Sequence, residues 1–364
     1  MKNILICSDS FKGTLSSKDI SNICKETVSF LFPNQFCIDS LLIADGGEGT
    51  LDAFSNILKG KFITIKSVDA ENNNIDVNVY VTNNNEAIIE VANIIGLPMI
   101  KKNISPLNRT TKGIGIVIKD LIKRNIKTFY IGLGGTSTSD MGIGMLQELG
   151  VDFGVNDPLT MNNASLINKI DVSKSILNNK DINIVCLSDV INPLFGDKGA
   201  NKVFGPQKGF NEDDIKILED NFIHISNLIK RDLNVDLNNV SSLGAAGGLS
   251  SAFYAFSNCK IKSGIDELLR LSNFKEKVKN VDYVISGEGR FDEQSLNGKV
   301  ISGILKNIDK NKLIIICGKS KIKDNIGIKI YQTSKDSMPY TFIKENAKRL
   351  YMETLINVLN DIKD

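Results

Sequence analysis

The stretch Gly132-Leu-Gly-Gly-Thr-Ser-Thr-Ser-Asp-Met-Gly-Ile-Gly144 follows a β-branched and aromatic run, 128–131, and leads into a helical pattern that ends at Gly150. A strand, a polar glycine loop and a helix start can together bind an anion, because glycines admit the ligand while hydroxyls and helical N–H groups donate to it. The alternative is a capped turn with Ser139 or Asp140 as the N-cap. In the anion-binding interpretation, the ligand-binding residues of this loop are Gly134, Gly135, Thr136, Ser137 and Asp140.

The composition narrows the classes of protein to which the chain can belong. Its 364 residues predict about two domains, and 42% hydrophobic with 24% charged residues is typical of a globular protein. A net charge of +2 argues against a general nucleic-acid binder. One histidine, His224, and six cysteines without a C-x-x-C pair argue against a zinc site or a histidine-based catalytic triad.

The hydrophobic runs of the chain are all short. None approaches the ~18 apolar residues of a membrane span, and the N-terminal run is too short for a signal peptide. We therefore expect a cytoplasmic protein with no membrane partner. A monomer or a homodimer would fit this composition equally well.

A second unit of strand, polar loop and helix lies at the N-terminus. The strand pattern 3–7 leads to Ser10 and Lys12, and a helical pattern follows at 17–31. A lysine beside a glycine at a strand end suits a phosphate group. The alternative is a solvated loop lysine, and this loop by itself does not decide between the two.

In a third unit of strand, polar loop and helix, the loop has the unusual sequence Ala44-Asp-Gly-Gly-Glu-Gly-Thr50. Its carboxylates, Asp45 and Glu48, could hold Mg²⁺ or accept a hydrogen bond from a substrate hydroxyl. Gly46 and Gly47 would bring the backbone close to that ligand. Alternatively, Glu48 only favours the dipole of the next helix. We favour the functional interpretation here.

The sequence pattern changes between residues 61 and 92. Three alternating strand patterns separated by Asn-rich turns predict an antiparallel meander there, whereas the rest of the chain alternates strands and helices. We therefore expect an α/β protein with a Rossmann- or flavodoxin-like parallel sheet at 1–58 and 272–364. The segment 59–271 would form a second, inserted α/β domain that contains the meander.

Polar residues also follow the strand pattern 182–187, which could belong to either domain, as could the strand at 128–132. Asp189 stands at the carboxyl end of this strand, where open α/β sheets place their ligands. Asn192 follows it. A later Gly/Pro-bounded loop adds two polar handles, Gln207 and Lys208.

The strand pattern 281–286 leads into a charged run. Arg290 stands there between the carboxylates of Glu288 and Asp292. A guanidinium at a strand end could bind a carboxylate or a phosphate through two hydrogen bonds. It could also simply pair with the two neighbouring acids.

Other glycine-rich runs are interpreted structurally or excluded. Gly244-Ala-Ala-Gly-Gly248 permits close packing, and packing between elements is favoured there over contact with a ligand. Gly318-Lys-Ser320 is no P-loop, because Leu313 stands where such a loop needs its first glycine. The dinucleotide fingerprint G-x-G-x-x-G is absent from the chain.

Seven short sequence motifs, taken in their order along the chain, resemble those of the type I glycerate kinase family. The resemblance extends from residue 1 almost to the end of the chain. The resemblance implies transfer of the γ-phosphate of ATP to glycerate with Mg²⁺, and two α/β domains with the active site in the cleft between them. Ser139 and Cys7-Ser8 depart from the family pattern at peripheral positions. The seven motifs are Asp9-Ser-Phe-Lys-Gly13, Ala44-Asp-Gly-Gly-Glu-Gly-Thr50, Gly132-Leu-Gly-Gly-Thr-Ser-Thr-Ser-Asp140, Asn192-Pro-Leu, Phe204-Gly-Pro-Gln-Lys-Gly209, Gly244-Ala-Ala-Gly-Gly248 and Gly287-Glu-Gly-Arg290.

Phosphoryl transfer needs cations, oriented donors and a carboxylate near the attacking hydroxyl, without a histidine. We expect Lys12 and Arg290 to bind anions, one the phosphates and the other the glycerate carboxylate. Asp189 would orient or deprotonate the hydroxyl, and Asp45 would hold Mg²⁺. The product would be 2-phosphoglycerate from D-glycerate. Alternatives are formation of 3-phosphoglycerate, a kinase of another small hydroxy acid, or a non-catalytic sensor of a phosphorylated metabolite.

Overall fold

The computed structural model describes residues 1–101, 104–238, 240–296, 300–322 and 327–363. The chain divides into two compact units. Unit 1 comprises Met1–Asp45, Asp52–Leu58 and Gly264–Asp364, and unit 2 comprises Gly46–Leu51 and Lys59–Ser263. Relative to the expected boundaries, 264–271 packs with unit 1 and the short loop 46–51 packs with unit 2.

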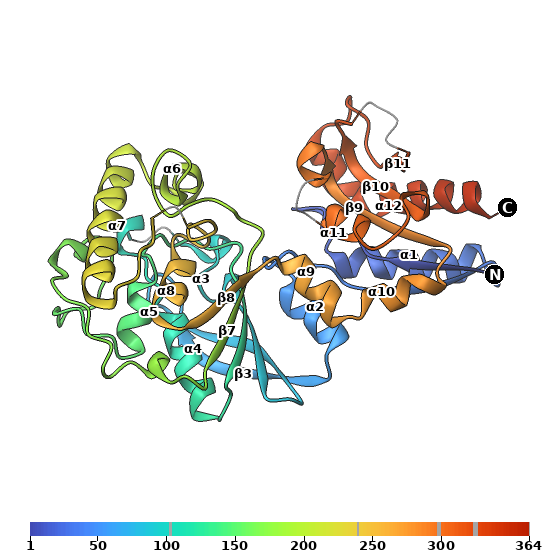
Figure 1. Ribbon diagram of the computed structural model, residues 1–364. Coiled ribbons are helices and arrows are strands. Elements are labelled where there is room, and N and C mark those ends of the chain that lie inside the picture. The colour runs from blue at the N-terminus through green and yellow to red at the C-terminus, as the bar shows by residue number, and fades with distance from the viewer. Residues whose placement is uncertain (102–103, 239, 297–299, 323–326, 364) are drawn as a thin grey trace. The chain divides into compact units, whose positions relative to one another are not determined.

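Unit 1 is built on a five-stranded, wholly parallel sheet, which confirms the predicted sheet of N-terminal and C-terminal strands (Figure 1). The strand order is β11-β10-β9-β1-β2. The strands are β1 (Lys2–Ile6), β2 (Phe36–Ser40), β9 (Tyr283–Phe291), β10 (Leu313–Ser320) and β11 (Lys329–Gln332). The helices of this part of the chain are α1 (Ser17–Leu31), α2 (Thr50–Ile57), α9 (Gly264–Leu271), α10 (Phe274–Lys277), α11 (Val300–Leu305) and α12 (Tyr340–Ile362).

The strands of unit 1 are apolar on both faces, as is typical of a parallel sheet covered on both sides. On one face, Ile6, Ile285 and Ile316 pack with buried side chains of α1 and α12. On the other face, Leu5 and Ile315 are also fully buried. The sheet is therefore the middle layer of its unit, and only its strand ends remain to carry polar function.

Unit 2 is built on a six-stranded mixed sheet in the order β3-β4-β5-β6-β7-β8. The first three strands form the predicted antiparallel meander, and the remaining pairs are parallel, so both uncertain strands lie in this sheet. The strands are β3 (Gly60–Val68), β4 (Asn74–Thr82), β5 (Glu86–Glu90), β6 (Thr128–Gly132), β7 (Asn183–Leu187) and β8 (Asn258–Lys262). The helices are α3 (Ala92–Ile95), α4 (Lys112–Lys123), α5 (Ile143–Glu148), α6 (Ala200–Phe204), α7 (Glu212–Leu233) and α8 (Leu249–Phe256).

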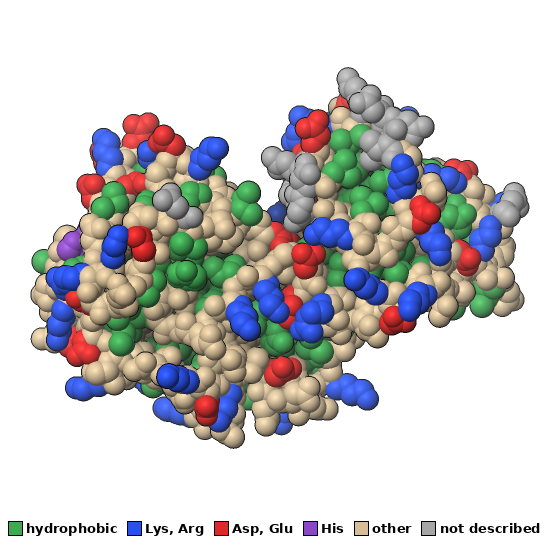
Figure 2. Space-filling view, viewed as in Figure 1, with side chains coloured by type: hydrophobic (Ala, Val, Ile, Leu, Met, Phe, Trp, Pro, Cys, Tyr) green, Lys and Arg blue, Asp and Glu red, His purple; other side chains and the backbone are tan. Residues whose placement is uncertain are grey.

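Short 3₁₀ turns connect many of these elements. They are η1 (Leu97–Met99), η2 (Pro106–Asn108), η3 (Ala164–Leu166), η4 (Ile176–Asn178), η5 (Pro206–Lys208), η6 (Val278–Asn280), η7 (Glu293–Leu296) and η8 (Lys310–Lys312). None of the helices in the described residues is long and apolar enough to cross a membrane. Acidic and basic side chains are interspersed over the face shown in Figure 2, in agreement with the small net charge.

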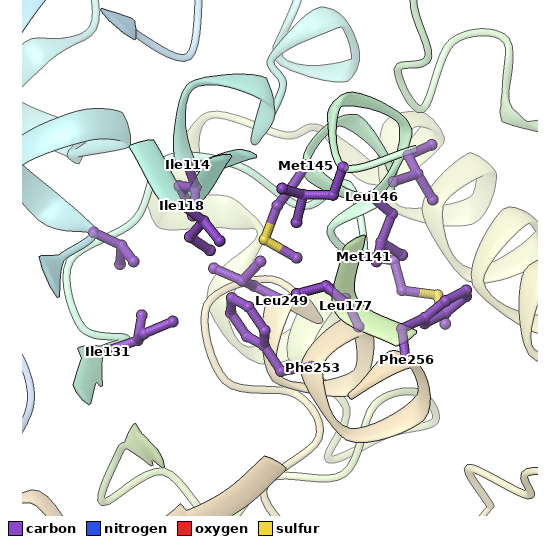
Figure 3. Packing of buried hydrophobic residues seen from close by; sticks show 14 of the residues in the cluster. Ile114, Ile118, Ile131, Met141, Met145, Leu146, Leu177, Leu249, Phe253 and Phe256 are labelled. Atoms are coloured by element: carbon purple, nitrogen blue, oxygen red, sulfur yellow. The ribbon is translucent and has the colours of Figure 1, made fainter. Parts of the chain in front are cut away.

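The core of unit 2 explains the position of the glycine loop. Figure 3 shows Ile118 of α4, Met145 of α5 and Phe253 of α8 converging in one apolar cluster. The hydrophobic pattern predicts a helix from Met141, but α5 begins two residues later, at Ile143. Met141 and Gly142 have φ of 52° and 74°, in the left-handed region, so the chain turns sharply before the helix can start.

Glycines at one strand of unit 1 give a test of this packing. A Cβ on Gly287 would collide with the carbonyl oxygen of Ile316 in β10, whereas a Cβ on Gly289 would meet nothing closer than Phe11 Cα at 3.6 Å. We predict that Gly287→Ala lowers the free energy of unfolding by about 1–3 kcal/mol, because the strands must separate. Gly289→Ala, two residues along the same strand, is the control and should change it by less than about 0.5 kcal/mol. Urea unfolding would measure both, and equal midpoints would contradict the close approach of β9 and β10.

Candidate active site

The parallel pairing of β1 with β9 joins two loops that are far apart in the sequence. The N–H of Cys7 donates to the Ile285 carbonyl at 2.8 Å, and that of Asp9 donates to the Gly287 carbonyl at 2.9 Å. The chain leaves β1 towards β2 on one side of the sheet, whereas β9 continues to β10 and β11 on the other side. This reversal is the topological switch point, where open α/β sheets bind ligands beyond the strand ends.

Asp9 is the most perturbed carboxyl at this strand edge. Its pKa is raised to about 7, first because burial disfavours the ionised form and second because the Asp45 carboxylate is near. Glu288 acts in the same direction, whereas the Ser10 N–H, 2.7 Å from Oδ1, and the Lys12 ammonium lower the pKa of Asp9. Sequence reasoning gave Asp9 no role, although its position at a strand end beside Lys12 was a usable signal.

The carboxylates at this edge could hold Mg²⁺ only together with other ligands. Among the described residues, no three His, Cys, Asp or Glu side chains are grouped closely enough to hold a metal ion by themselves. Mg²⁺ normally takes only one or two carboxylates and completes its shell with phosphate oxygens and water. A desolvated Asp9 with Asp45 and Glu288 near it is a donor set that fits this requirement. Glu48, which sequence reasoning placed near the metal, is exposed to solvent.

Lys12 lies at the tip of a tight turn. The N–H of Phe11 donates to the Leu15 carbonyl at 2.7 Å, and the N–H and hydroxyl of Thr14 both donate to the Phe11 carbonyl. Gly13 has φ of 80°, which lets the turn close. The exposed Lys12 side chain is thus carried by a fixed backbone.

Arg290 stands at the end of β9, and its side chain is 60% exposed. Its Nε lies 3.6 Å from the Asp292 carboxylate, so the pairing given above as the alternative is present. An exposed ion pair of this kind contributes less than about 1 kcal/mol, so a bound anion could readily replace it. Lys12 and Arg290 line the same pocket of about 380 Å³ in unit 1. The structure therefore brings these two predicted residues together.

In unit 2, the glycines of two predicted loops pack against each other. The N–H of Gly134 donates to the Gly46 carbonyl at 2.9 Å, and a Cβ on Gly134 would collide with Gly47. A Cβ on Gly46 would collide with Leu187 at the end of β7. The glycines are thus needed for backbone packing, and their contact with a ligand stays a prediction.

The carboxylate of Asp140 lies at the start of α5, where the sequence predicts an anion, and contact of this loop with a ligand stays a prediction. Asp140 is buried, and its carboxylate accepts hydrogen bonds from the Thr111 N–H and hydroxyl, both at 2.8 Å, and from the Gly142 N–H at 3.1 Å. Burial nevertheless raises the pKa of Asp140. Asp140 therefore ties the glycine loop to the start of α4, which is close to the capped-turn alternative. Gly142 occupies the N-cap position of α5.

Two other hydroxyls of this loop are bonded inside the protein, whereas the buried Thr138 hydroxyl has no hydrogen-bond partner. Ser137 donates its hydroxyl to the Ile95 carbonyl at 2.8 Å. Thr136 accepts a hydrogen bond at 3.3 Å from the ammonium of Lys208, which also donates to the Thr138 carbonyl at 2.6 Å. Gly135 has φ of 76°, in the left-handed region that this turn of the loop requires.

Lys208 is a buried cation, although sequence reasoning described it as a polar handle in a loop. Burial lowers its pKa to about 7, the Arg109 guanidinium adds to this effect, and Asp140 opposes it. Arg109 is itself 4% exposed and donates to the Lys208 carbonyl at 2.6 Å. Sequence reasoning missed Arg109, because an arginine outside any glycine loop gives no signal of burial.

The remaining predicted residues are more dispersed. Asp189 is half-buried beyond the end of β7, and Asn192 donates its amide to the Lys198 carbonyl at 2.8 Å, while Gln207 is exposed. The glycines of 244–248 pack against backbone of neighbouring loops, as the structural interpretation expected.

The acid at the start of α2 is Glu90, and not Glu48, whose position there was the alternative to a functional role. The Glu90 carboxylate accepts hydrogen bonds from the Gly49 and Leu51 N–H groups at 3.3 and 3.1 Å. These contacts supply the negative charge that an N-terminal helical turn prefers. The alternative role considered for Glu48 is therefore filled by Glu90, which lies at the end of β5.

Cations and carboxylates gathered at the carboxyl edge of a parallel sheet are the equipment of an α/β phosphotransferase. The model of the glycerate kinase family matches residues 4–363. Glycerate 2-kinase of Escherichia coli (strain K12) is 33% identical over 342 residues, which cover 92% of this chain and 89% of that protein. Glycerate kinase of Neisseria meningitidis serogroup B is 35% identical over 325 residues, which cover 86% of this chain and 85% of that protein.

A crystal structure assigned as glycerate kinase 2 from Salmonella typhimurium LT2 superposes with a TM-score of 0.81 at 29% identity. The superposition covers 100% of this chain and 98% of that one. The chain belongs to the glycerate kinase family. It is an enzyme, a kinase of that family.

The raised pKa of Asp9 predicts a specific dependence of stability on pH. The folded-state pKa of about 7 lies above the ordinary value near 4, so the contribution of Asp9 is fully present below pH ~4 and is lost as pH rises through 7. Asp9→Asn should therefore gain stability relative to the wild type between pH 4 and 7, by about 4 kcal/mol. Urea unfolding across this pH range measures the difference. Asp213→Asn on the exposed start of α7 is the control, and a pH-independent difference for Asp9→Asn would reject the prediction.

Proposed function

We propose that the protein transfers the γ-phosphoryl group of ATP to the C2 hydroxyl of D-glycerate and releases 2-phosphoglycerate, with Mg²⁺ as cofactor. The observation that carries the proposal is the pocket that Lys12 and Arg290 share beyond the ends of β1 and β9, where the Asp45 and Glu288 carboxylates also act electrostatically on Asp9. A kinase needs both charges, because the phosphates require cations and their metal requires carboxylates. A sensor of a phosphorylated metabolite would gain nothing from acidic groups beside its anion.

The choice of substrate rests on the relatives. Membership of the glycerate kinase family supports glycerate as the acceptor, and the name of the Escherichia coli relative supports its C2 hydroxyl. The kinase reaction itself supports ATP as the donor. Expectations of an active site in a cleft between two domains, of a cytoplasmic location and of a monomer or homodimer stay predictions.

Lys12 and Arg290 bind the anionic groups of the substrates in this proposal. Both stand at strand ends and line one pocket. Phosphoryl transfer involves little covalent chemistry for the protein, so fixed cations that neutralise the transferred group supply a large part of the rate enhancement. Because Lys12 lies in a tight turn with a fixed backbone, little backbone conformational entropy is lost when its side chain binds an anion.

Asp45 and Asp9 would hold Mg²⁺ together with phosphate oxygens. Mg²⁺, when bound, neutralises charge on the phosphates and orients them for in-line attack. The chain's own part is to present the Asp9 carboxyl to that cation, whose positive charge would favour the ionised form that burial disfavours.

Asp189 is assigned to the attacking hydroxyl. A carboxylate within ~3 Å of that hydroxyl accepts its hydrogen bond and takes its proton as the new P–O bond forms. Asp189 is half-buried beyond the carboxyl end of β7, which is where a parallel strand delivers a catalytic side chain. The neighbours Ser188 and Asn192 are polar and uncharged, so the local chain adds no second acid.

The reaction itself is the test of the proposal. The purified protein would be incubated with ATP, Mg²⁺ and each of a set of small hydroxy acids, and the products would be identified by ³¹P and ¹H NMR. The proposal expects 2-phosphoglycerate from D-glycerate as the main product. 3-Phosphoglycerate, or faster turnover of a different hydroxy acid, would replace it with one of the alternative reactions, and absence of any product would favour the sensor.

Two carboxylate variants should separate the roles of base and metal ligand. Asp189→Asn should lower kcat by roughly 10²- to 10⁴-fold and leave the KM for ATP nearly unchanged, because the amide cannot accept the proton. Asp45→Asn should raise the Mg²⁺ concentration needed for half-maximal rate, and added Mg²⁺ should partly restore its activity. Steady-state kinetics at several Mg²⁺ concentrations measure both effects, and each variant is the control for the other. If Asp189→Asn keeps most of its turnover at every pH, the assignment of Asp189 is wrong.

A further inference from the structure

The pocket that contains Lys12 and Arg290 is larger than two anion contacts require. Its volume is about 380 Å³, within the ~300–1,000 Å³ range of small-molecule sites. Its walls come from the turn after β1, the ends of β9 and β10, the segment after β11 and the first half of α12. It therefore lies beside the switch point of the parallel sheet, inside unit 1.

One wall of this pocket is apolar. The helix α12 contributes Ile343, Ala347 and Leu350, and the turn after β1 contributes Phe11. The Phe11 ring meets the fully buried Tyr351 ring edge to face, with their centroids 5.6 Å apart, so this wall is anchored in the core. A fixed apolar surface of this kind suits an aromatic ring, whereas glycerate has no apolar part to place on it.

The strand ends supply positively charged side chains to the same pocket. Four cationic side chains line the pocket: Lys12, Arg290, Lys319 and Lys321. Among the described lining residues, Asp336 is the one acid, and it lies on the surface 3.4 Å from the Lys319 ammonium. A single carboxylate does not call for four cations, whereas a polyphosphate carries three to four negative charges at neutral pH.

Two of these cations are placed against each other by the sheet. Lys319 of β10 is paired in register with Arg290 of β9, so both side chains leave the same face of neighbouring strands. Like charges directly opposite each other in a sheet are destabilising. A bound anion turns this repulsion into attraction, and the pair is thus an independent indication of a multiply charged ligand.

Lys319 belongs to Gly318-Lys-Ser320, the motif rejected above as a P-loop. The strand β10 stays paired with β9 as far as Ser320, so this segment does not form a loop that curls around a phosphate. The N–H of Ser320 already donates to the Gln332 side chain at 2.8 Å. Here the lysine side chain, and not a nest of backbone N–H groups, would contact the phosphates.

We propose that this pocket is the nucleotide site, with the polyphosphate held by Lys319, Arg290 and Lys12 and the base against the α12 wall. The inference rests on the proposed kinase function and narrows it. It assigns both predicted anion-binding residues, Lys12 and Arg290, to ATP, so that the glycerate carboxylate is bound by other residues.

Direct binding tests this assignment without relying on turnover. Isothermal titration calorimetry with Mg²⁺ and the non-hydrolysable analogue AMP-PNP would compare the wild type with Lys319→Ala and Ala347→Trp. Lys319→Ala should weaken binding about tenfold to a hundredfold, as expected for loss of a charge-assisted contact. Ala347→Trp should weaken it at least as much by filling the apolar wall. Lys335→Ala, an exposed lysine next to the pocket but outside its lining, is the matched control and should bind like the wild type.

Kinetics complete the test. Lys319→Ala should raise the KM for ATP and leave that for glycerate unchanged. Unaltered AMP-PNP affinity in both variants, or an increase confined to the KM for glycerate, would overturn the assignment. Circular dichroism and thermal unfolding verify that Ala347→Trp is folded. If Ala347→Trp does not fold, the affinity of Lys319→Ala, a substitution at the surface, still decides whether the pocket binds nucleotide. If the variants lose AMP-PNP affinity but the wild type phosphorylates no hydroxy acid, the nucleotide site stands and the proposed function fails.

Discussion

The parallel pairing of β1 with β9 is the contact on which the candidate site depends. It joins Asp9 to Gly287 by a 2.9 Å backbone hydrogen bond across most of the chain length, and it creates the reversal of direction at which the strand ends open. Gly287 and Gly318 let the backbones of β9 and β10 approach closely. Because of this pairing, side chains from three separate segments reach one pocket and one group of carboxylates.

The glycine loop 132–144 is tied into the protein by its own polar groups, and its contact with an anion stays a prediction. Its side chains are buried, and its polar groups are largely satisfied inside the protein by Asp140, Lys208 and neighbouring carbonyl groups. Buried polar networks of this kind fix a loop in one conformation, because each member left unpaired would cost about 1–3 kcal/mol. The loop is thus a rigid support beside the ends of β6 and β7, and Asp189 extends from the second of these strands.

The sequence was sufficient wherever a local pattern determines structure. The helix at 17–31, the meander and the parallel strands were predicted at nearly their observed positions, because capping residues and hydrophobic periodicity act within a few residues. The start of α5 was misplaced because a left-handed Met141 is not visible in a hydrophobic pattern. Asp9 and Lys208 were undervalued because their pKa values depend on partners more than 30 residues away in the chain. The pairing of Lys319 with Arg290 likewise exists only once the strand register is known.

Hydrogen exchange with mass spectrometry tests the central claim, that nucleotide is bound at the strand ends of unit 1. The full-length protein would be compared with and without Mg²⁺ and AMP-PNP. The account predicts slower exchange of amides in 12–15 and 319–321, where the cations of the pocket lie, and little change in the loop 133–141, which does not line the pocket. Protection confined to 133–141, with 12–15 and 319–321 unaffected, would contradict it and return the phosphates to the glycine loop.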